Sequence, residues 1–190
     1  FFRWALILPL AIPPYIGAYT YSGMVSYTGV IQRFFRNILG VELNQKYFDI
    51  MSIEGAIFIF TLFLFPYIYM VTMTFLEKQS AGLIESARLL GSSAIGIFFR
   101  VIIPVSRGAI VAGSTLIALE VLSDYGVVSY LGVQTFSTAI FKSWISLGDV
   151  DSAIRLAGIL MVVVFIIISS EKALRGRKKY SFTNTKVRPI

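Results

Sequence analysis

The stretch GAIFIFTLFLFPYIYMVTMTFL, Gly55 to Leu76, contains no charged residue and is followed at once by Glu77 and Lys78. A helix needs about 20 apolar residues to cross the roughly 30 Å hydrocarbon core of a bilayer. The stretch therefore predicts a membrane-spanning helix over residues 55–76. Because a helix satisfies its own backbone hydrogen bonds in lipid, we expect the chain to be an all-α membrane protein.

Three other stretches are long and apolar enough to cross a membrane. The first contains Pro9, Pro13 and Pro14, which should kink its helix. A more polar segment at residues 30–39 has the spacing of a short amphipathic helix in the headgroup region, with Gly40 as its stop. A second short helix, interfacial or re-entrant, is predicted around residues 135–145. The expected architecture is a bundle of about four spanning helices, at about residues 4–21, 55–76, 104–122 and 152–170.

The composition supports a membrane protein. Of the 190 residues, 56% are hydrophobic and only 14% are charged, and the mean hydropathy is +0.78. Soluble domains carry about 25% charged residues, so a soluble enzyme is excluded as the default, and disorder is excluded by the abundance of apolar residues. The chain has no cysteine and no histidine, which excludes disulfides, Cys/His zinc sites and imidazole bases. We therefore assign no metal site.

The basic residues predict which side of the membrane each segment faces. The net charge is +7, and seven of the 17 basic residues follow Ser170. With Arg3 and the segment 77–107 on the same side as this tail, that side holds twelve basic residues and the other side holds four. Basic residues are retained in the cytoplasm, so we predict a cytoplasmic tail at 171–190 after a membrane domain at 1–170. The same distribution predicts contact with lipid headgroups and no binding of nucleic acid.

The predicted cytoplasmic loop, residues 77–104, contains a pattern that indicates function. The segment LIESARLLG, Leu83 to Gly91, is followed nine residues later by VIIP, Val101 to Pro104. Gly91 can end one helix with a positive φ, and Ser92 can cap the next. The pattern predicts a rigid helix–turn–helix that could transmit movement from a soluble partner to the membrane helices. Its first helix should present one apolar face, formed by Leu83, Ile84, Ala87 and Leu90.

This spacing resembles the EAA loop of ABC-importer permeases: Glu-Ala-Ala, three residues, Gly, nine residues, then Ile-x-Leu-Pro. Ser86, Val101 and Ile103 replace Ala, Ile and Leu of that pattern, and the other positions match directly at Glu85, Ala87, Gly91 and Pro104. Before the tail, nearly the whole chain resembles the ferric-iron permeases of this group. The similar segments are LPLAIP (8–13), FPYIY (65–69), EVLSDYGVVSYLGV (120–133), TFSTAIF (135–141) and Trp144.

The resemblance implies an inner-membrane channel subunit of a bacterial importer, coupled to ATP hydrolysis by separate cytoplasmic ATPase subunits. It also implies a periplasmic or lipid-anchored solute-binding protein and a second permease half as partners. The chain would be most of an N-terminal half, with two more helices upstream. It implies no cofactor and no ATPase activity in this chain, and Gly91 to Gly96 lacks the Lys-Ser/Thr of a P-loop. The implied ATPase-coupling residues are Leu83, Glu85, Ser86, Ala87, Gly91 and Pro104.

Acidic residues at the end of the third span allow two interpretations. Glu120 and Asp124 lie four residues apart, on one face of a helix, and with Tyr125 and Tyr130 they could line the path of a hard cation. Alternatively, Glu120 pairs with Arg155 of the last span while Asp124 only ends its helix. We favour the second interpretation, because a transporter should not hold its cargo tightly.

Other functions remain open at this point. The main alternative is a permease of the same superfamily for another solute, such as thiamine, sulfate or an amino acid. A passive channel is a second alternative, although it would need no coupling loop. A membrane-embedded enzyme is disfavoured, because Glu120, Asp124 and Arg155 form no recognisable catalytic set.

Overall fold

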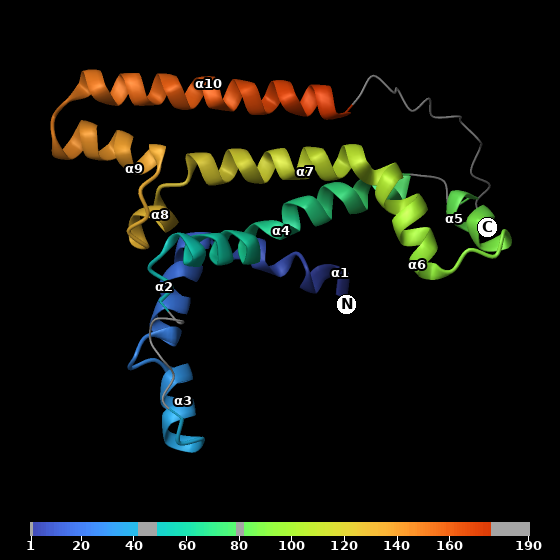
Figure 1. Cartoon of the computed structure of the whole chain (residues 1–190), viewed down its shortest axis with the longest axis horizontal. Helices are drawn as coiled ribbons and strands as arrows, with labels where there is room; N and C mark the ends of the chain where they lie inside the picture. Colours follow the sequence, from blue (N-terminus) through green and yellow to red (C-terminus); the bar gives the residue numbers. More distant parts are fainter. Residues whose placement is uncertain (1, 42–48, 79–81, 176–190) are drawn as a thin grey trace.

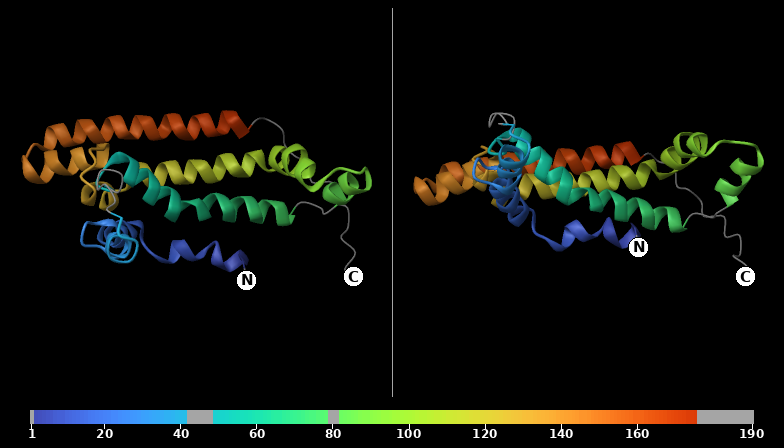
Figure 2. Two further views of the ribbon diagram at one scale, coloured as in Figure 1. Left: turned by 60° about the horizontal axis from the view of Figure 1, so that its bottom comes forward. Right: turned by 90° about the horizontal axis from the view of Figure 1, so that it is seen from below.

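The computed structural model describes residues 2–41, 49–78 and 82–175, and in these ranges the regular structure is helical throughout. Three long helices lie side by side and alternate in direction (Figures 1 and 2). They are α4 (Ile53–Lys78), α7 (Ile103–Ser123) and α10 (Val150–Arg175). By length and composition, three helical stretches within the described ranges can cross a membrane, at Ile53–Glu77, Ala94–Ser123 and Val150–Leu174. The all-α membrane class is confirmed.

The second of these stretches is longer than the sequence predicted. It begins with α6 (Ala94–Ile97), passes through a π-helical turn, η3 (Phe98–Ile102), and continues as α7. Helix α7 itself agrees with the predicted span at residues 104–122, and Pro104 lies in its first turn, where the missing N–H of proline is tolerated. The helical stretch begins earlier, because the π turn joins α6 to α7 without a break. The ribbon bends at this junction (Figure 1), as expected where a π turn interrupts the α-helical ladder.

The N-terminal stretch is broken, so the predicted single helix over residues 4–21 is wrong. Its pieces are α1 (Phe2–Ala5), the 3-10 helix η1 (Leu8–Ala11) and α2 (Pro14–Val25). Prolines at three positions within six residues remove the N–H donors that one continuous helix would need. The first two pieces run beside α4, whereas α2 turns away from the bundle (Figure 1).

Short helices gather at the end of the bundle where α4 begins. Both predicted short helices are present, although their placement in the headgroup region stays a prediction. Gly40 has a φ of 65° after the first of them, which confirms its predicted role as a stop. These elements are α3 (Val30–Ile38), α8 (Gly126–Tyr130), α9 (Phe136–Phe141) and the π-helical turn η4 (Lys142–Ser146).

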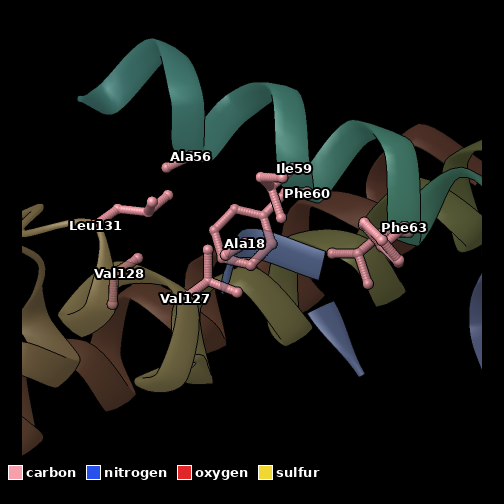
Figure 3. Close-up of a cluster of buried hydrophobic side chains, with 9 residues drawn as sticks. Ala18, Ala56, Ile59, Phe60, Phe63, Val127, Val128 and Leu131 are labelled. Atoms are coloured by element: carbon pink, nitrogen blue, oxygen red, sulfur yellow. The ribbon is translucent and has the colours of Figure 1, made fainter. Parts of the chain in front are cut away.

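A cluster of buried hydrophobic side chains lies where the first half of α4 meets α2 and α8 (Figure 3). Ile59 and Val127 are completely buried there, and Phe63 is 7% exposed. Further along α4, the backbone of Ile68 lies so close to Gly113 of α7 that a Cβ built on the glycine would be 2.7 Å from the Ile68 Cα. Small residues thus let α7 approach α4, as expected for helices that pack within a membrane.

Parts of the sequence predictions fall outside the described residues. Lys46 is one of them, and it was predicted to lie on the outer side. The others are residues 79–81 of the predicted cytoplasmic loop and residues 176–190 of the predicted basic tail.

Candidate functional site

The predicted helix–turn–helix is present between α4 and α7. Its first helix, α5 (Gly82–Leu89), contains Leu83, Glu85, Ser86 and Ala87. Gly91 follows with a φ of 77°, a conformation that glycine adopts without the strain a Cβ would cause. The N–H of Ser92 donates to the Ala87 carbonyl at 3.1 Å, which closes the turn.

The cap of the second helix differs by one residue from the prediction. The N-cap of α6 is Ser93, not Ser92, and its hydroxyl accepts a hydrogen bond from the N–H of Gly96 at 3.2 Å. Ser92 instead lies in the turn, where its N–H donates to the Ala87 carbonyl. Pro104, the last residue of the motif, is exposed near the start of α7.

Apolar side chains cover the tip of this motif. Leu89 is 90% exposed, Leu90 is 84% exposed and Ile95 is 73% exposed. The predicted packing of Leu90 within one helical face is wrong, since Leu90 lies in the exposed turn. The motif projects beyond the end of α4 (Figures 1 and 2). We call the exposed residues Leu89, Leu90 and Ile95 the apolar tip.

The chain segments that the basic residues assigned to one side do meet at one end of the molecule. Helix α1, the end of α4, the helix–turn–helix formed by α5 and α6, and the end of α10 all lie there (Figure 1). Arg3 Nη1 is 2.7 Å from Glu77 Oε1, which ties the first residues to the end of α4. The predicted alternation of the helices is therefore present, and the assignment of this end to the cytoplasm stays a prediction. We call the opposite end the outer end.

The predicted acidic pair at the outer end is not brought together as one site. Glu120 is exposed on α7 and makes no ion pair with Arg155, which is itself exposed. The pairing that we favoured is therefore wrong. Asp124 does end its helix, because it follows the last residue of α7, and its Oδ1 accepts the N–H groups of Val127 at 2.9 Å and Val128 at 3.3 Å.

Burial raises the pKa of Asp124 above its ordinary value, and the N–H groups of Val127 and Val128 act in the opposite direction. The Asp124 carboxylate thus accepts the first N–H groups of α8. In the described residues, no group of three or more acidic side chains converges on one point, so these side chains form no cluster that could hold a metal ion.

The two predicted tyrosines lie on different surfaces. The ring of Tyr130 packs edge-on against Tyr19 of α2, with 5.7 Å between ring centroids. The ring of Tyr125 lies 4.2 Å from that of Phe141 on α9, at a tilt of 32°. Tyr125 therefore forms a wall between α8 and α9, whereas Tyr130 belongs to the packing between α2 and α8.

Beside Tyr125 is a pocket that the sequence did not reveal. It has a volume of about 350 Å³ and lies at the outer end between α8 and the α9–η4 segment. Lys142, the first residue of η4, is on its wall together with several hydroxyl and amide side chains. Lys142 is also the one basic residue between Arg107 and Arg155 in the sequence, which was a signal that could have drawn attention to this segment.

A model of the protein family described as "Binding-protein-dependent transport system inner membrane component" matches residues 45–170, which include α4, the apolar tip, α7 and most of α10. The chain belongs to this family. This membership agrees with the resemblance of residues 83–104 to the EAA loop of ABC-importer permeases. Membership of this family and the long apolar helices also support a multi-pass protein of the inner membrane.

Several curated permeases are similar in sequence. The Fe(3+)-transport system permease protein FbpB 2 of Haemophilus influenzae is 31% identical over 178 residues, which are 94% of this chain and 31% of that protein. The molybdenum transport system permease protein ModB of the same organism is 24% identical over 180 residues, 90% of this chain and 76% of that protein. The spermidine/putrescine permease PotB of Escherichia coli is 29% identical over 129 residues, 67% of this chain and 46% of that protein. The chain thus spans about a third of the length of the iron permease.

Proposed function

We propose that this permease couples ATP hydrolysis by a separate ATPase subunit to solute import, and that the apolar tip is the docking surface for that subunit. The observation that carries the proposal is the exposed helix–turn–helix joined to a membrane helix. Leu89 and Leu90 are almost fully exposed, and no described residue covers them. Burial of these two leucine side chains against a protein partner would be favourable by roughly 1.5–3 kcal/mol each. This burial would stabilise the complex with that partner.

Movement of the tip would reach the membrane through continuous helix. Because α6, η3 and α7 form one uninterrupted helical stretch, a partner that displaces α6 also moves α7. The close approach of Gly113 to Ile68 then passes this movement to α4. A passive channel would need neither feature. The remaining partners in the proposal are a solute-binding protein at the outer end, a second permease half and the surrounding lipids.

We propose ferric iron as the solute. The supporting observation is that the similarity to the iron permease extends over 94% of this chain at 31% identity. Molybdate and spermidine or putrescine are the alternatives that the names of the other similar permeases suggest. Thiamine, sulfate and amino acids, the alternatives considered from the sequence, are not represented among these three names.

Docking is tested by recovery of the ATPase subunit with tagged permease from detergent-solubilised membranes. Glu85→Arg places the opposite charge on α5, and Gly91→Pro cannot adopt the φ of 77° that the turn needs. Glu54→Arg, at the other end of the molecule in the first turn of α4, is a matched charge reversal. We expect the ATPase with the wild type and Glu54→Arg but not with the other two variants. Equal recovery with all four would contradict the proposal.

Orientation is tested with single cysteines, since the chain contains none of its own. Ser92→Cys in the turn should react with a membrane-impermeant thiol reagent only after the cells are opened. Ser146→Cys at the outer end should react in spheroplasts, whose outer surface is accessible. The reverse pattern would place the apolar tip outside the cell and exclude a cytoplasmic ATPase as its partner.

The solute is tested by uptake into cells that lack their own iron, molybdate and polyamine importers and that express the complete transport system. We expect radiolabelled ferric iron to accumulate in an ATP-dependent manner, and the Glu85→Arg variant to abolish this accumulation. Uptake of molybdate or spermidine in its place would retain the importer and replace its solute. ATP-independent uptake would favour a channel.

A further inference from the structure

The outer-end pocket between α8 and α9–η4 has the size and lining of a site for a small polar ligand. Its volume of about 350 Å³ lies within the range of small-molecule sites. The stacked rings of Tyr125 and Phe141 form one apolar wall. Polar side chains occupy other parts of the lining and are Ser129, Gln134, Thr138, Lys142 and Ser146.

Most of these polar side chains are available to a ligand. In the described parts of the chain, the Thr138 hydroxyl is engaged in hydrogen bonds that cap α9, whereas Ser129, Gln134, Lys142 and Ser146 have no side-chain hydrogen bond or ion pair. All four are exposed. The pocket therefore presents hydroxyl and amide donors next to an ammonium group.

The charge of the lining is positive. Lys142 is the charged residue among those that line the pocket, and no aspartate or glutamate is among them. The neighbouring carboxylates are engaged elsewhere. Asp124 accepts the N–H groups that begin α8, and Asp149 accepts the N–H of Ser152 at the start of α10 at 3.0 Å. An anion is therefore the complementary ligand, and a bare cation would be repelled.

The two walls are held in place by hydrogen bonds that do not involve a ligand. The Ser137 hydroxyl donates to the Asp124 carbonyl, which joins α9 to the residue that follows α7. Thr135 and Thr138 form a reciprocal cap at the start of α9. Next to α9, the π turn of η4 has the N–H of Leu147 bonded to the Lys142 carbonyl at 3.1 Å. A preformed site loses less conformational entropy when a ligand binds.

We propose that this pocket binds a small oxyanion, with Lys142 as its charge partner and Ser129, Gln134 and Ser146 as hydrogen-bond donors. The shared chemistry is a phosphate-like or carboxylate-like group. Such a group is supplied either by a free anion at the outer face or by the phosphate of an anionic lipid. The proposal does not depend on the docking of an ATPase, because the pocket and the apolar tip lie at opposite ends of the molecule.

The test uses the complete chain in phosphatidylcholine nanodiscs and inorganic phosphate as the probe, with binding measured by titration calorimetry. Lys142→Gln should weaken phosphate binding about 10-fold or more, the usual effect of losing a charged hydrogen-bond partner. Lys142→Arg should retain binding. Arg155→Gln removes the same charge from an exposed position on α10 that is not part of the pocket, and it should bind like the wild type.

A second arm distinguishes the lipid source. Trp144 lies within η4, with its ring 6.4 Å from that of Phe141, so its fluorescence reports on the pocket. Trp4→Phe removes the other tryptophan. In this background, nanodiscs that contain phosphatidylglycerol should change the Trp144 emission, and Lys142→Gln should remove the change if lipid is the ligand.

Each outcome decides the proposal. Saturable phosphate binding that requires Lys142 supports a free oxyanion, and a Lys142-dependent response to phosphatidylglycerol alone supports the lipid phosphate. Absence of both responses overturns the proposal. Equal losses in Lys142→Gln and Arg155→Gln also overturn it, because they would show that net charge and not the pocket attracts the anion.

Discussion

Substitution of Gly113 by alanine should destabilise the protein by forcing α4 and α7 apart. A Cβ at this position would be 2.7 Å from the Ile68 Cα and 3.2 Å from its Cγ1. Ordinary van der Waals contact begins at about 3.4 Å, and the nearest atom belongs to the backbone, which cannot rotate away as a side chain can. The two helices would have to separate by several tenths of an ångström over their contact.

The expected magnitude combines two opposing effects. Overpacking of a close contact typically costs about 1–3 kcal/mol. Replacing glycine by alanine inside a helix is favourable by about 1 kcal/mol, which offsets part of this cost. Gly108 lies on the same helix with no atom within 4 Å of its built Cβ, so Gly108→Ala shows the helix effect alone. The difference between the two variants, about 1–3 kcal/mol, therefore isolates the packing effect.

The assay is the free energy of unfolding in mixed micelles, measured from the loss of helical circular dichroism as SDS is titrated. We expect Gly108→Ala to be as stable as the wild type or more stable, and Gly113→Ala to be less stable than Gly108→Ala. Equal stability of the two alanine variants would refute the close approach of α7 to α4 at Ile68.

Three other predictions follow from single contacts. Phe63→Ala should lower the free energy of unfolding by about 3–5 kcal/mol, because Phe63 is only 7% exposed in the buried cluster. Phe58→Ala on the same helix is the control and should cost clearly less, because Phe58 is 50% exposed. Cysteines in place of Arg3 and Glu77 should be joined by a short bis-maleimide cross-linker, seen as a shifted band in gels, because the two longer native side chains meet at their charged ends. Failure to cross-link would contradict the placement of the N-terminus beside α4. Hydrogen bonds from Ser152 lower the pKa of Asp149 from its ordinary value of 3.8. The ionised Asp149 carboxylate therefore stabilises the fold above pH 3.8, and this stabilisation is lost as the pH falls through the lowered pKa. The melting temperature of Asp149→Asn should fall less on acidification than that of the wild type.

The parts of the fold that the sequence predicted well depend on local patterns. The uncharged stretch at residues 55–76 became α4 with limits displaced by two residues at each end. Gly91 and Gly40 both adopt the positive φ expected where a helix stops. Hydrophobic length and glycine stops act within a few residues of the chain, so they can be recognised without knowledge of tertiary packing.

The main error arose at the prolines near the N-terminus. The run of apolar residues at 4–21 predicted one membrane-spanning helix. In the structure, Pro9 lies in a 3-10 helix and Pro14 starts a new α-helix. Pro104 does lie in the first turn of α7, as predicted, but the sequence did not show that a π turn extends the helical stretch back to Ala94. Whether a proline ends, kinks or leaves a helix intact depends on which partners its freed carbonyls find, and the sequence does not contain that information.

The outer-end pocket depends on tertiary contacts that local patterns do not show. Helix α8 is only five residues long, too short for a periodicity signal. The hydrogen bond between Ser137 and Asp124 joins residues 13 positions apart. Sequence reasoning placed Glu120 and Asp124 on one face, because residues four apart share a helix face, but this holds only while the helix continues. Here α7 ends at Ser123.

Helix α7 connects the two candidate sites. At one end its extension through η3 carries the apolar tip, and at the other end Asp124 supports α8 with its carboxylate and α9 with its carbonyl. Between them, Gly113 lies close to the backbone of Ile68, which makes this contact a natural pivot between α7 and α4. A force on the tip that tilts α7 would turn it about this contact. Tilting moves the Asp124 end in the opposite direction, so the same close contact that stabilises the bundle would also convert movement at the tip into movement of the pocket walls.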